Sequence, residues 1–180
     1  MLHVIAGAVA QIGNQDKIGQ ASASYMVDGI VYHPEQLAHN QVIMLPNDPT
    51  KEGYSFVEWI GLPTTMPISD VIVNASFTIN EYTLTYTVDG EEYKTETLAY
   101  GTELTALVAP TKEGYTFSGW SELPETMPAK DITITGSFNV NHYMLTYIID
   151  GVIYQSEPVA YGTAITMLEA PAKSGYSFDG

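Results

Sequence analysis

The chain has 180 residues, of which 21 are acidic and 6 are basic, all of the latter Lys, so the formal net charge is −15. Nucleic acids and anionic membrane surfaces bind cationic faces, often through Arg, so this composition argues against both kinds of partner. The absence of Cys excludes a disulfide framework and a thiolate metal site, and no run approaches the ~20 apolar residues needed for membrane insertion.

The chain begins with a leader, residues 1–20, that does not take part in the repeat described below. Its apolar run, residues 4–10, ends in an Ala-x-Ala pattern, but no Lys or Arg precedes it and it is short for a secretory signal. We therefore interpret the leader as a folded attachment segment. It would bind a protein partner (a capsid, tail or surface protein) in a groove or by adding a strand to it.

A period of 61 residues runs through the rest of the chain, since it separates Tyr54, Tyr115 and Tyr176. Self-similarity at a fixed period indicates a tandem array. We divide the array into repeat 1 (residues 21–81), repeat 2 (residues 82–142) and an incomplete repeat 3 (residues 143–180). A unit of this length can fold alone only marginally, so its stability must come from an aromatic core, to which contact with a neighbouring unit could add.

Each repeat is expected to begin with a β-hairpin. Residues 82–100 alternate apolar and polar side chains on either side of an Asp-Gly pair, which is typical of two strands joined by a primed turn. The predicted turn residues are Asp28, Gly29, Asp89, Gly90, Asp150 and Gly151. Repeat 1 has small residues at 21–24 where repeat 2 has Tyr82-Thr83-Leu84-Thr85, so we expect its first strand to be weakened or engaged with the leader.

A second turn follows the hairpin at Tyr100-Gly101 and again at Tyr161-Gly162. His39-Asn40 stands at this place in repeat 1. Because Asn is the residue that most often substitutes for Gly in the left-handed conformation, the turn is expected to survive the change.

The second half of each repeat contains an aromatic strand, a connection with two prolines and a closing strand. Tyr115 and Phe117 alternate onto one face, whereas Trp120 falls out of phase by one residue, so a bulge near Ser118-Gly119 is expected to return it to the core. The predicted core aromatics are Tyr54, Phe56, Trp59, Tyr115, Phe117, Trp120 and Phe138. The alternative is that the Trp residues are exposed and form a platform for sugar stacking.

The motifs taken together resemble a known family. Residues 82–90 read Tyr-x-Leu-x-Tyr-x-Val-Asp-Gly, residues 110–120 read "PTKEGYTFSGW", and Thr126-Met127-Pro128 lies three residues before Asp131. This set is similar to the Listeria–Bacteroides repeat family, the class of the internalin B-repeats. The resemblance implies a mainly β fold, a tandem array of small β-grasp-like modules with a 61-residue period, found on bacterial surface proteins as stalk, spacer or adhesion elements without a catalytic site.

We expect no enzyme activity and no cofactor or metal site. None of the histidines recurs at the repeat step; they are His3, His33, His39 and His142. No nucleophile elbow or phosphate-binding loop accompanies them. His33 and His39 could form a pair of metal ligands, but with no third ligand evident they are interpreted as solvated loop residues.

Three hypotheses of function follow. The first is an outward-projecting fibre or decoration protein of a bacteriophage virion, favoured because the leader lacks a convincing export signal. The alternatives are a bacterial cell-surface adhesin stalk and a carbohydrate-binding module. In each case the distal repeats could contact a host-surface protein or glycan, and self-association stays open.

Overall fold

The structure, a computed structural model, describes residues 19–180. The attachment role expected for residues 1–20 therefore lies almost wholly outside the described residues. The strands are β1 (Gln20–Val27), β2 (Ile30–Ala38), β3 (Tyr54–Ile60), β4 (Val71–Ile79), β5 (Glu81–Val88), β6 (Glu91–Ala99), β7 (Tyr115–Trp120), β8 (Ile132–Val140), β9 (His142–Ile149) and β10 (Val152–Ala160). No helix occurs among residues 19–180, hence none there that could cross a membrane, and the predicted mainly β class is confirmed.

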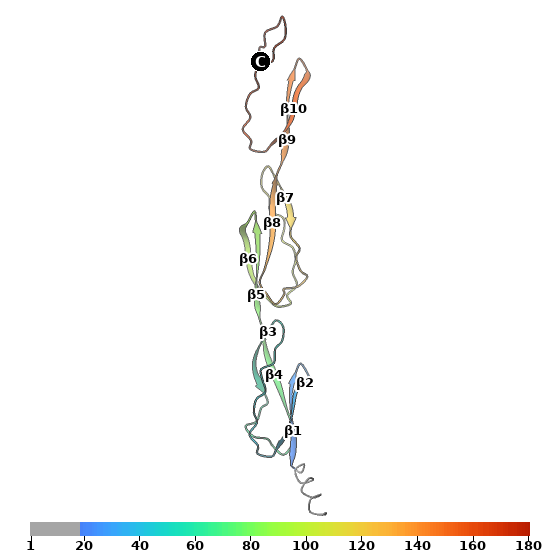
Figure 1. The fold of residues 1–180 in the computed structure, drawn as a ribbon, viewed down its shortest axis with the longest axis vertical. Coiled ribbons are helices and arrows are strands. Elements are labelled where there is room, and N and C mark those ends of the chain that lie inside the picture. The colour runs from blue at the N-terminus through green and yellow to red at the C-terminus, as the bar shows by residue number, and fades with distance from the viewer. Residues whose placement is uncertain (1–18) are drawn as a thin grey trace, which may run out of the picture. The chain divides into compact units, whose positions relative to one another are not determined.

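The strands form one sheet per repeat (Figure 1). The first sheet has the order β2-β1-β4-β3, the second has the order β6-β5-β8-β7, and β9 pairs with β10 in the third. In the first sheet the central strands β1 and β4 run parallel, and each has an antiparallel neighbour on its outer side. This order of a mixed sheet is the β-grasp order, so the expectation of β-grasp-like modules is confirmed.

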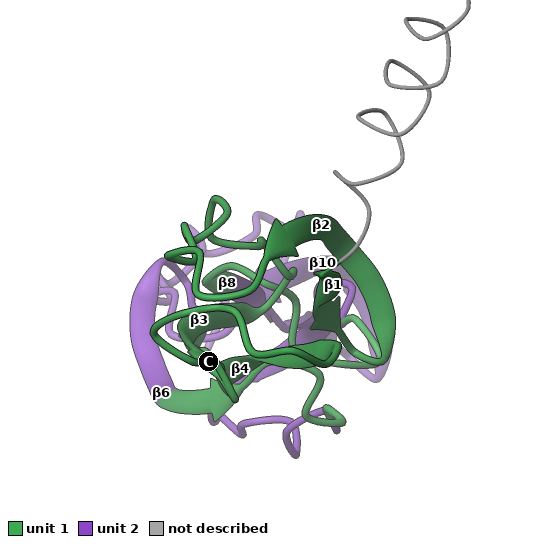
Figure 2. Cartoon of the chain, turned by 90° about the horizontal axis from the view of Figure 1, so that it is seen from below, with its two compact units in different colours: residues 1–84, 96–104, 124–132 green, residues 85–95, 105–123, 133–180 purple. Residues whose placement is uncertain are grey.

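The chain divides into two compact units, coloured green and purple in Figure 2. Among the described residues, unit 1 contains residues 19–84, 96–104 and 124–132, and unit 2 contains residues 85–95, 105–123 and 133–180. Unit 1 thus holds repeat 1 with three segments of repeat 2, and unit 2 holds the remainder of repeat 2 with repeat 3.

The first strand of repeat 1, expected to be weakened or engaged with the leader, is present at full length, and any contact with residues 1–18 lies outside the described residues. β1 has 8 residues, pairs with β2 along its length and pairs in parallel with β4 from Ala23 to Met26. Ala21, Ala23 and Tyr25 alternate into the core, at 6%, 0% and 0% exposed. The ladder is made by backbone groups, and the small side chains keep the inward alternation, so the loss of Tyr and Leu did not remove the strand.

The Asp-Gly turns adopt the left-handed backbone that a primed turn requires. The φ angles are 48° and 79° at Asp28 and Gly29, 52° and 87° at Asp89 and Gly90, and 49° and 77° at Asp150 and Gly151. At the second turn Asn40 has φ 62°, close to the 78° of Gly101 and the 79° of Gly162. The turn therefore survives the change from Gly to Asn.

The expected bulge before Trp120 is present. The pairing register of β7 with β8 shifts between Phe117 and Trp120, which places Trp120 opposite Gly136. A Cβ at Gly136 would overlap the ring of Phe117. Repeat 1 has Ala75 at the corresponding position, and there the ring centroids of the Phe and Trp lie 5.5 Å apart instead of 4.9 Å. The bulge in β7 thus brings the rings of Phe117 and Trp120 into contact.

Candidate functional site: the repeated aromatic cluster

Trp120 is the centre of the aromatic cluster in repeat 2. Its ring centroid lies 4.9 Å from that of Phe117, 5.1 Å from that of Tyr86 and 5.9 Å from that of Tyr93. Its indole Nε1–H donates a hydrogen bond to the backbone carbonyl of Leu107 at 3.0 Å. The ring is therefore in contact with β5, β6 and the loop before β7.

Trp59 occupies the same position in repeat 1. Its centroid lies 5.1 Å from that of Tyr25, 5.5 Å from that of Phe56 and 6.0 Å from that of Tyr32. Only 8% of Trp59 is exposed, and its Nε1 has no hydrogen-bond partner among the described residues. So little of the ring is open that a ligand could not stack on its face.

The other predicted aromatics lie at the far end of the same strands. Tyr115 and Phe117 both contact Phe138, at centroid distances of 6.5 Å and 5.4 Å. In repeat 1, Phe56 contacts Phe77 at 5.8 Å, and Tyr54 is half-buried. Phe56 and Phe77 are thus in ring contact in repeat 1, and Tyr115, Phe117 and Phe138 are in ring contact in repeat 2.

The sequence interpretation missed the tyrosines of the edge strands, which recur at the 61-residue step. Tyr32, Tyr93 and Tyr154 are 45%, 51% and 55% exposed, and the first two lie against the Trp of their repeats, which is buried in repeat 1 and half-buried in repeat 2. The recurrence itself was the signal that could have found them. An exposed Tyr can stack on a flat apolar ligand. The two residues before it are Ile30-Val31 in repeat 1 and Glu91-Glu92 in repeat 2, so these neighbours supply no polar groups common to both repeats.

A Lys also recurs, and it links the loop before the aromatic strand to the hairpin turn. The Nζ–Oδ2 distances are 2.9 Å for Lys51–Asp28, 3.7 Å for Lys112–Asp89 and 3.0 Å for Lys173–Asp150. The same Nζ atoms lie 4.3 Å, 4.2 Å and 4.3 Å from the ring centroids of Tyr54, Tyr115 and Tyr176. Each Lys therefore makes an ion pair and a cation–π contact.

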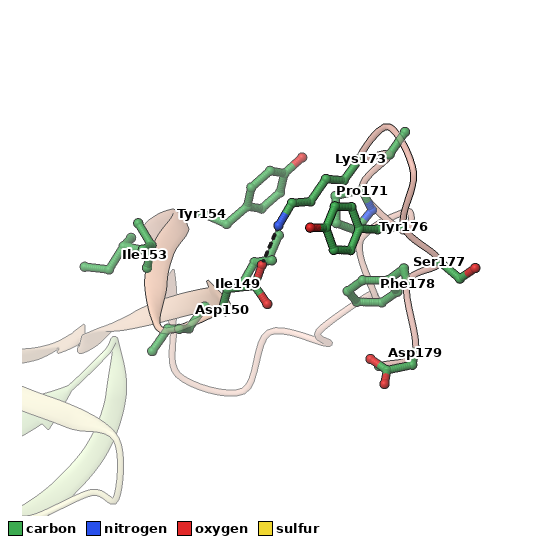
Figure 3. A pocket seen from close by; sticks show the side chains of 14 residues that line it. Ile149, Asp150, Ile153, Tyr154, Pro171, Lys173, Tyr176, Ser177, Phe178 and Asp179 are labelled. Atoms are coloured by element: carbon green, nitrogen blue, oxygen red, sulfur yellow. Dashed lines mark hydrogen bonds and ion pairs between the residues drawn. The ribbon is translucent and has the colours of Figure 1, made fainter.

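In repeat 3 this Lys borders an open hollow of about 430 Å³ (Figure 3). The hollow lies between the turn at Asp150 and the segment 171–180, and Lys173 reaches across it to the Asp150 carboxylate. Tyr176 and Phe178 point toward the same space. Because Lys173 and Asp150 are paired with each other, the hollow does not present this pair of opposite charges to a ligand.

We expect Lys112→Met to lower the free energy of unfolding by only about 0.5–1.5 kcal/mol, because exposed ion pairs and cation–π contacts are weak. The Lys112 and Asp89 side chains are 47% and 42% exposed, so added salt should shrink the loss. Urea denaturation at low and high salt measures it. Lys130→Met, at an exposed position, is the control and should change little. A salt-independent loss above about 3 kcal/mol would contradict the assignment of an exposed pair.

Tyr25 is the buried phenol of repeat 1. Its hydroxyl donates to the backbone carbonyl of Met44 at 3.3 Å, and its ring lies 5.8 Å from that of His33. Burial, followed by the negative charge of Glu35, raises the pKa of Tyr25 above its ordinary value of 10.0. The group therefore stays neutral at physiological pH and acts as a packing residue with a hydrogen bond.

The interpretation of His33 as a loop residue is wrong, because it lies within β2 and contacts Tyr25. His39 is exposed just after that strand, and His142 is the first residue of β9. His3 lies outside the described residues. Within residues 19–180 no three His, Asp or Glu side chains come together as metal ligands.

The repeated sheets, turns and aromatic clusters define a protein built of tandem β-grasp-like modules. The model of the Listeria-Bacteroides repeat domain matches residues 22–78, 82–139 and 143–180, and the chain therefore belongs to this family. The resemblance noted in the sequence is thus confirmed.

Similar proteins include internalin H of Listeria monocytogenes serovar 1/2a, which is 38% identical over 122 residues, covering 57% of this chain and 22% of internalin H. A protein of Evansella cellulosilytica is 28% identical over 162 residues, covering 75% of this chain and 24% of that protein. The chain thus spans about a quarter or less of the length of these relatives.

Among solved structures, domains 3-4 of the Streptococcal High Identity Repeats in Tandem of a cell surface protein match with a TM-score of 0.33 and 18% identity, covering 68% of this chain and 98% of that one. The type 2 repeat of the mucus binding protein MUB from Lactobacillus reuteri matches with a TM-score of 0.25 and 12% identity, covering 69% and 100%. Similarity at this level carries no functional argument.

Proposed function

We propose that the chain is part of a bacterial cell-surface protein in which its repeats form a non-enzymatic adhesion stalk. The observation that carries the proposal is the family match over three successive repeats, together with 38% identity to internalin H. The relatives are bacterial proteins, which favours the cell surface over a virion as the place of display.

The packing of the recurring aromatic residues supports a stalk. The Trp, Phe and Tyr rings that recur in the sequence pack against one another within each complete repeat, and Trp59 is 8% exposed. Because these residues fill a core, the needs of folding alone explain why they recur in each repeat. The net charge of −15 keeps such modules soluble and mutually repelling when many copies are displayed.

A carbohydrate-binding module is the second candidate, and the exposed Tyr32, Tyr93 and Tyr154 are the observation that favours it. These rings recur once per repeat, so weak stacking on a glycan would be multiplied along the array. Under this hypothesis the array itself would contact the host surface.

The 61-residue period allows the stalk to be shortened or lengthened without breaking its register. In the full-length protein on its native cell, one variant lacks residues 82–142 and another carries a second copy of them. At equal display, measured by flow cytometry, we expect adhesion to host cells to fall in the first variant and to persist or rise in the second.

The control is the triple variant Tyr32→Ala, Tyr93→Ala and Tyr154→Ala at the normal repeat number. A stalk predicts that adhesion is unchanged in it. If the triple variant lost adhesion while repeat number had no effect, the carbohydrate-binding hypothesis would replace the stalk.

A further inference from the structure

Successive repeats are joined by one residue that hydrogen-bonds in both directions. Asn80 stands alone between β4 and β5. Its backbone N–H donates to the carbonyl of Gly53 at 2.9 Å, and its carbonyl accepts the N–H of Tyr100 at 2.9 Å. All three residues belong to unit 1, although Gly53 is in repeat 1 and Tyr100 is in repeat 2. The joint therefore ties the aromatic-strand loop of one repeat to the second turn of the next.

The ring of Tyr100 closes this joint. It lies directly against Gly53, where a Cβ would overlap the ring atoms Cγ, Cδ1 and Cε1. It also meets the ring of Tyr54 edge-on, at a centroid distance of 6.0 Å and an interplanar angle of 75°. Gly53 is thus required by the approach of a side chain from the neighbouring repeat as well as by its φ of 75°.

The same joint recurs 61 residues later, within unit 2. The N–H of Asn141 donates to the carbonyl of Gly114 at 2.8 Å, and the N–H of Tyr161 donates to the carbonyl of Asn141 at 2.8 Å. A Cβ on Gly114 would overlap the Tyr161 ring, which lies 6.2 Å from that of Tyr115. The same arrangement therefore occurs at both places where one repeat passes into the next, at Asn80 and at Asn141.

Each joint is further fixed by the side chain of its Asn. The Oδ1 atom of Asn80 accepts a hydrogen bond from the hydroxyl of Ser55 at 2.6 Å, and that of Asn141 accepts one from the hydroxyl of Thr116 at 2.6 Å. Ser55 and Thr116 lie in the aromatic strands β3 and β7. Each Asn side chain is therefore bonded to the aromatic strand that precedes it.

We propose that the Gly-Tyr pair before each aromatic strand, Gly53-Tyr54 or Gly114-Tyr115, is a docking surface for the Tyr of the Tyr-Gly turn in the next repeat. This docking stabilises the repeat that carries the Gly-Tyr pair. In a linear array, stability is the sum of intrinsic terms and nearest-neighbour interfaces, and a 61-residue module is marginal by itself. The Tyr of one repeat thus completes the packing of the repeat before it. This inference holds wherever the array is displayed and whatever it binds.

Amide hydrogen exchange of the full chain tests the docking. Tyr100→Ala lies in repeat 2, yet we expect it to lower the protection of the β3–β4 amides in repeat 1 by about tenfold, because an aromatic pair and its buried area are lost. Tyr100→Phe keeps the ring that touches Gly53 and is expected to retain wild-type protection. Protection in repeat 1 that stays within about twofold in Tyr100→Ala would overturn the proposal.

Two controls separate docking from general destabilisation. Tyr93→Ala removes a ring that packs on Trp120 inside repeat 2, and it should leave protection in repeat 1 unchanged. Gly53→Ala should lower protection of the Tyr100 amide in the next repeat, whereas Gly29→Ala, at a similar φ of 79° with open space around it, should not. Equal losses at the Tyr100 amide from both glycine variants, or a loss in repeat 1 from Tyr93→Ala, would overturn the docking surface.

Discussion

Trp120→Ala is expected to lower the free energy of unfolding of repeat 2 by about 3–5 kcal/mol, the usual cost of truncating a large core aromatic. The substitution removes the ring contacts with Phe117 and Tyr86 and the hydrogen bond to the Leu107 carbonyl. A module of 61 residues has little stability beyond this amount. Urea denaturation of the full chain, followed by far-UV circular dichroism, should show an early transition for repeat 2.

Val108→Ala is the control, because Val108 lies one residue from the Trp120 hydrogen-bond acceptor and is 88% exposed. It should change the free energy of unfolding by less than about 0.5 kcal/mol. If Trp120→Ala kept the normal unfolding midpoint and instead abolished binding to a glycan surface, Trp120 would be a ligand platform and not a core residue.

Met127→Ala is expected to cost about 2–5 kcal/mol, since Met127 is 0% exposed. Its backbone N–H donates to the carbonyl of Thr102 at 2.8 Å, and its carbonyl accepts the N–H of Gly101 at 2.8 Å. These bonds hold the connection in place, so the side chain cannot retreat to solvent without breaking them. Met127→Leu conserves volume and should cost less than about 1.5 kcal/mol.

Met144→Ala provides a matched comparison, because Met144 lies in β9 and is 63% exposed. Its cost should stay below about 0.5 kcal/mol in the same denaturation experiment. Equal costs for the two Met variants would show that the connection carrying Met127 is not part of the core.

The hairpins and the bulge could be predicted from sequence because their signals are local. Asp-Gly between alternating residues defines a primed turn, and the phase of Trp120 relative to Phe117 requires one extra residue in the strand. The persistence of β1 in repeat 1 could not be predicted in the same way. Its ladder depends on β2 and on the distant β4, and the burial of Ala21 and Ala23 follows from that pairing.

Burial of Met66 and Met127 was beyond sequence reasoning because a connection with two prolines has no periodicity to reveal an inward side. The connection is held by contacts with the second turn of the same repeat, such as the bridge between Glu103 and Thr126. The docking of Tyr100 on Gly53 is equally non-local. A 61-residue recurrence marks such positions as important but does not state what they touch.

Whether the repeats are exposed on a bacterial cell or on a virion is the part of the functional proposal for which the sequence alone gives the least support. The sequence favours a virion only through the weakness of the export signal in residues 1–20, of which residues 1–18 lie outside the described structure. Family membership and the match to internalin H favour a bacterial cell surface instead. The distinction concerns where the repeats are exposed, so it can be tested without knowledge of a ligand.

The most direct test is antibody labelling of intact, unpermeabilised cells of the organism that encodes the chain, with an antibody raised against the folded chain. A cell-surface stalk predicts labelling of these cells, removal of the label by brief treatment with trypsin, and no labelling of cells from which the gene has been deleted. Labelling found only after permeabilisation, or only on purified virus particles, would contradict the proposed stalk.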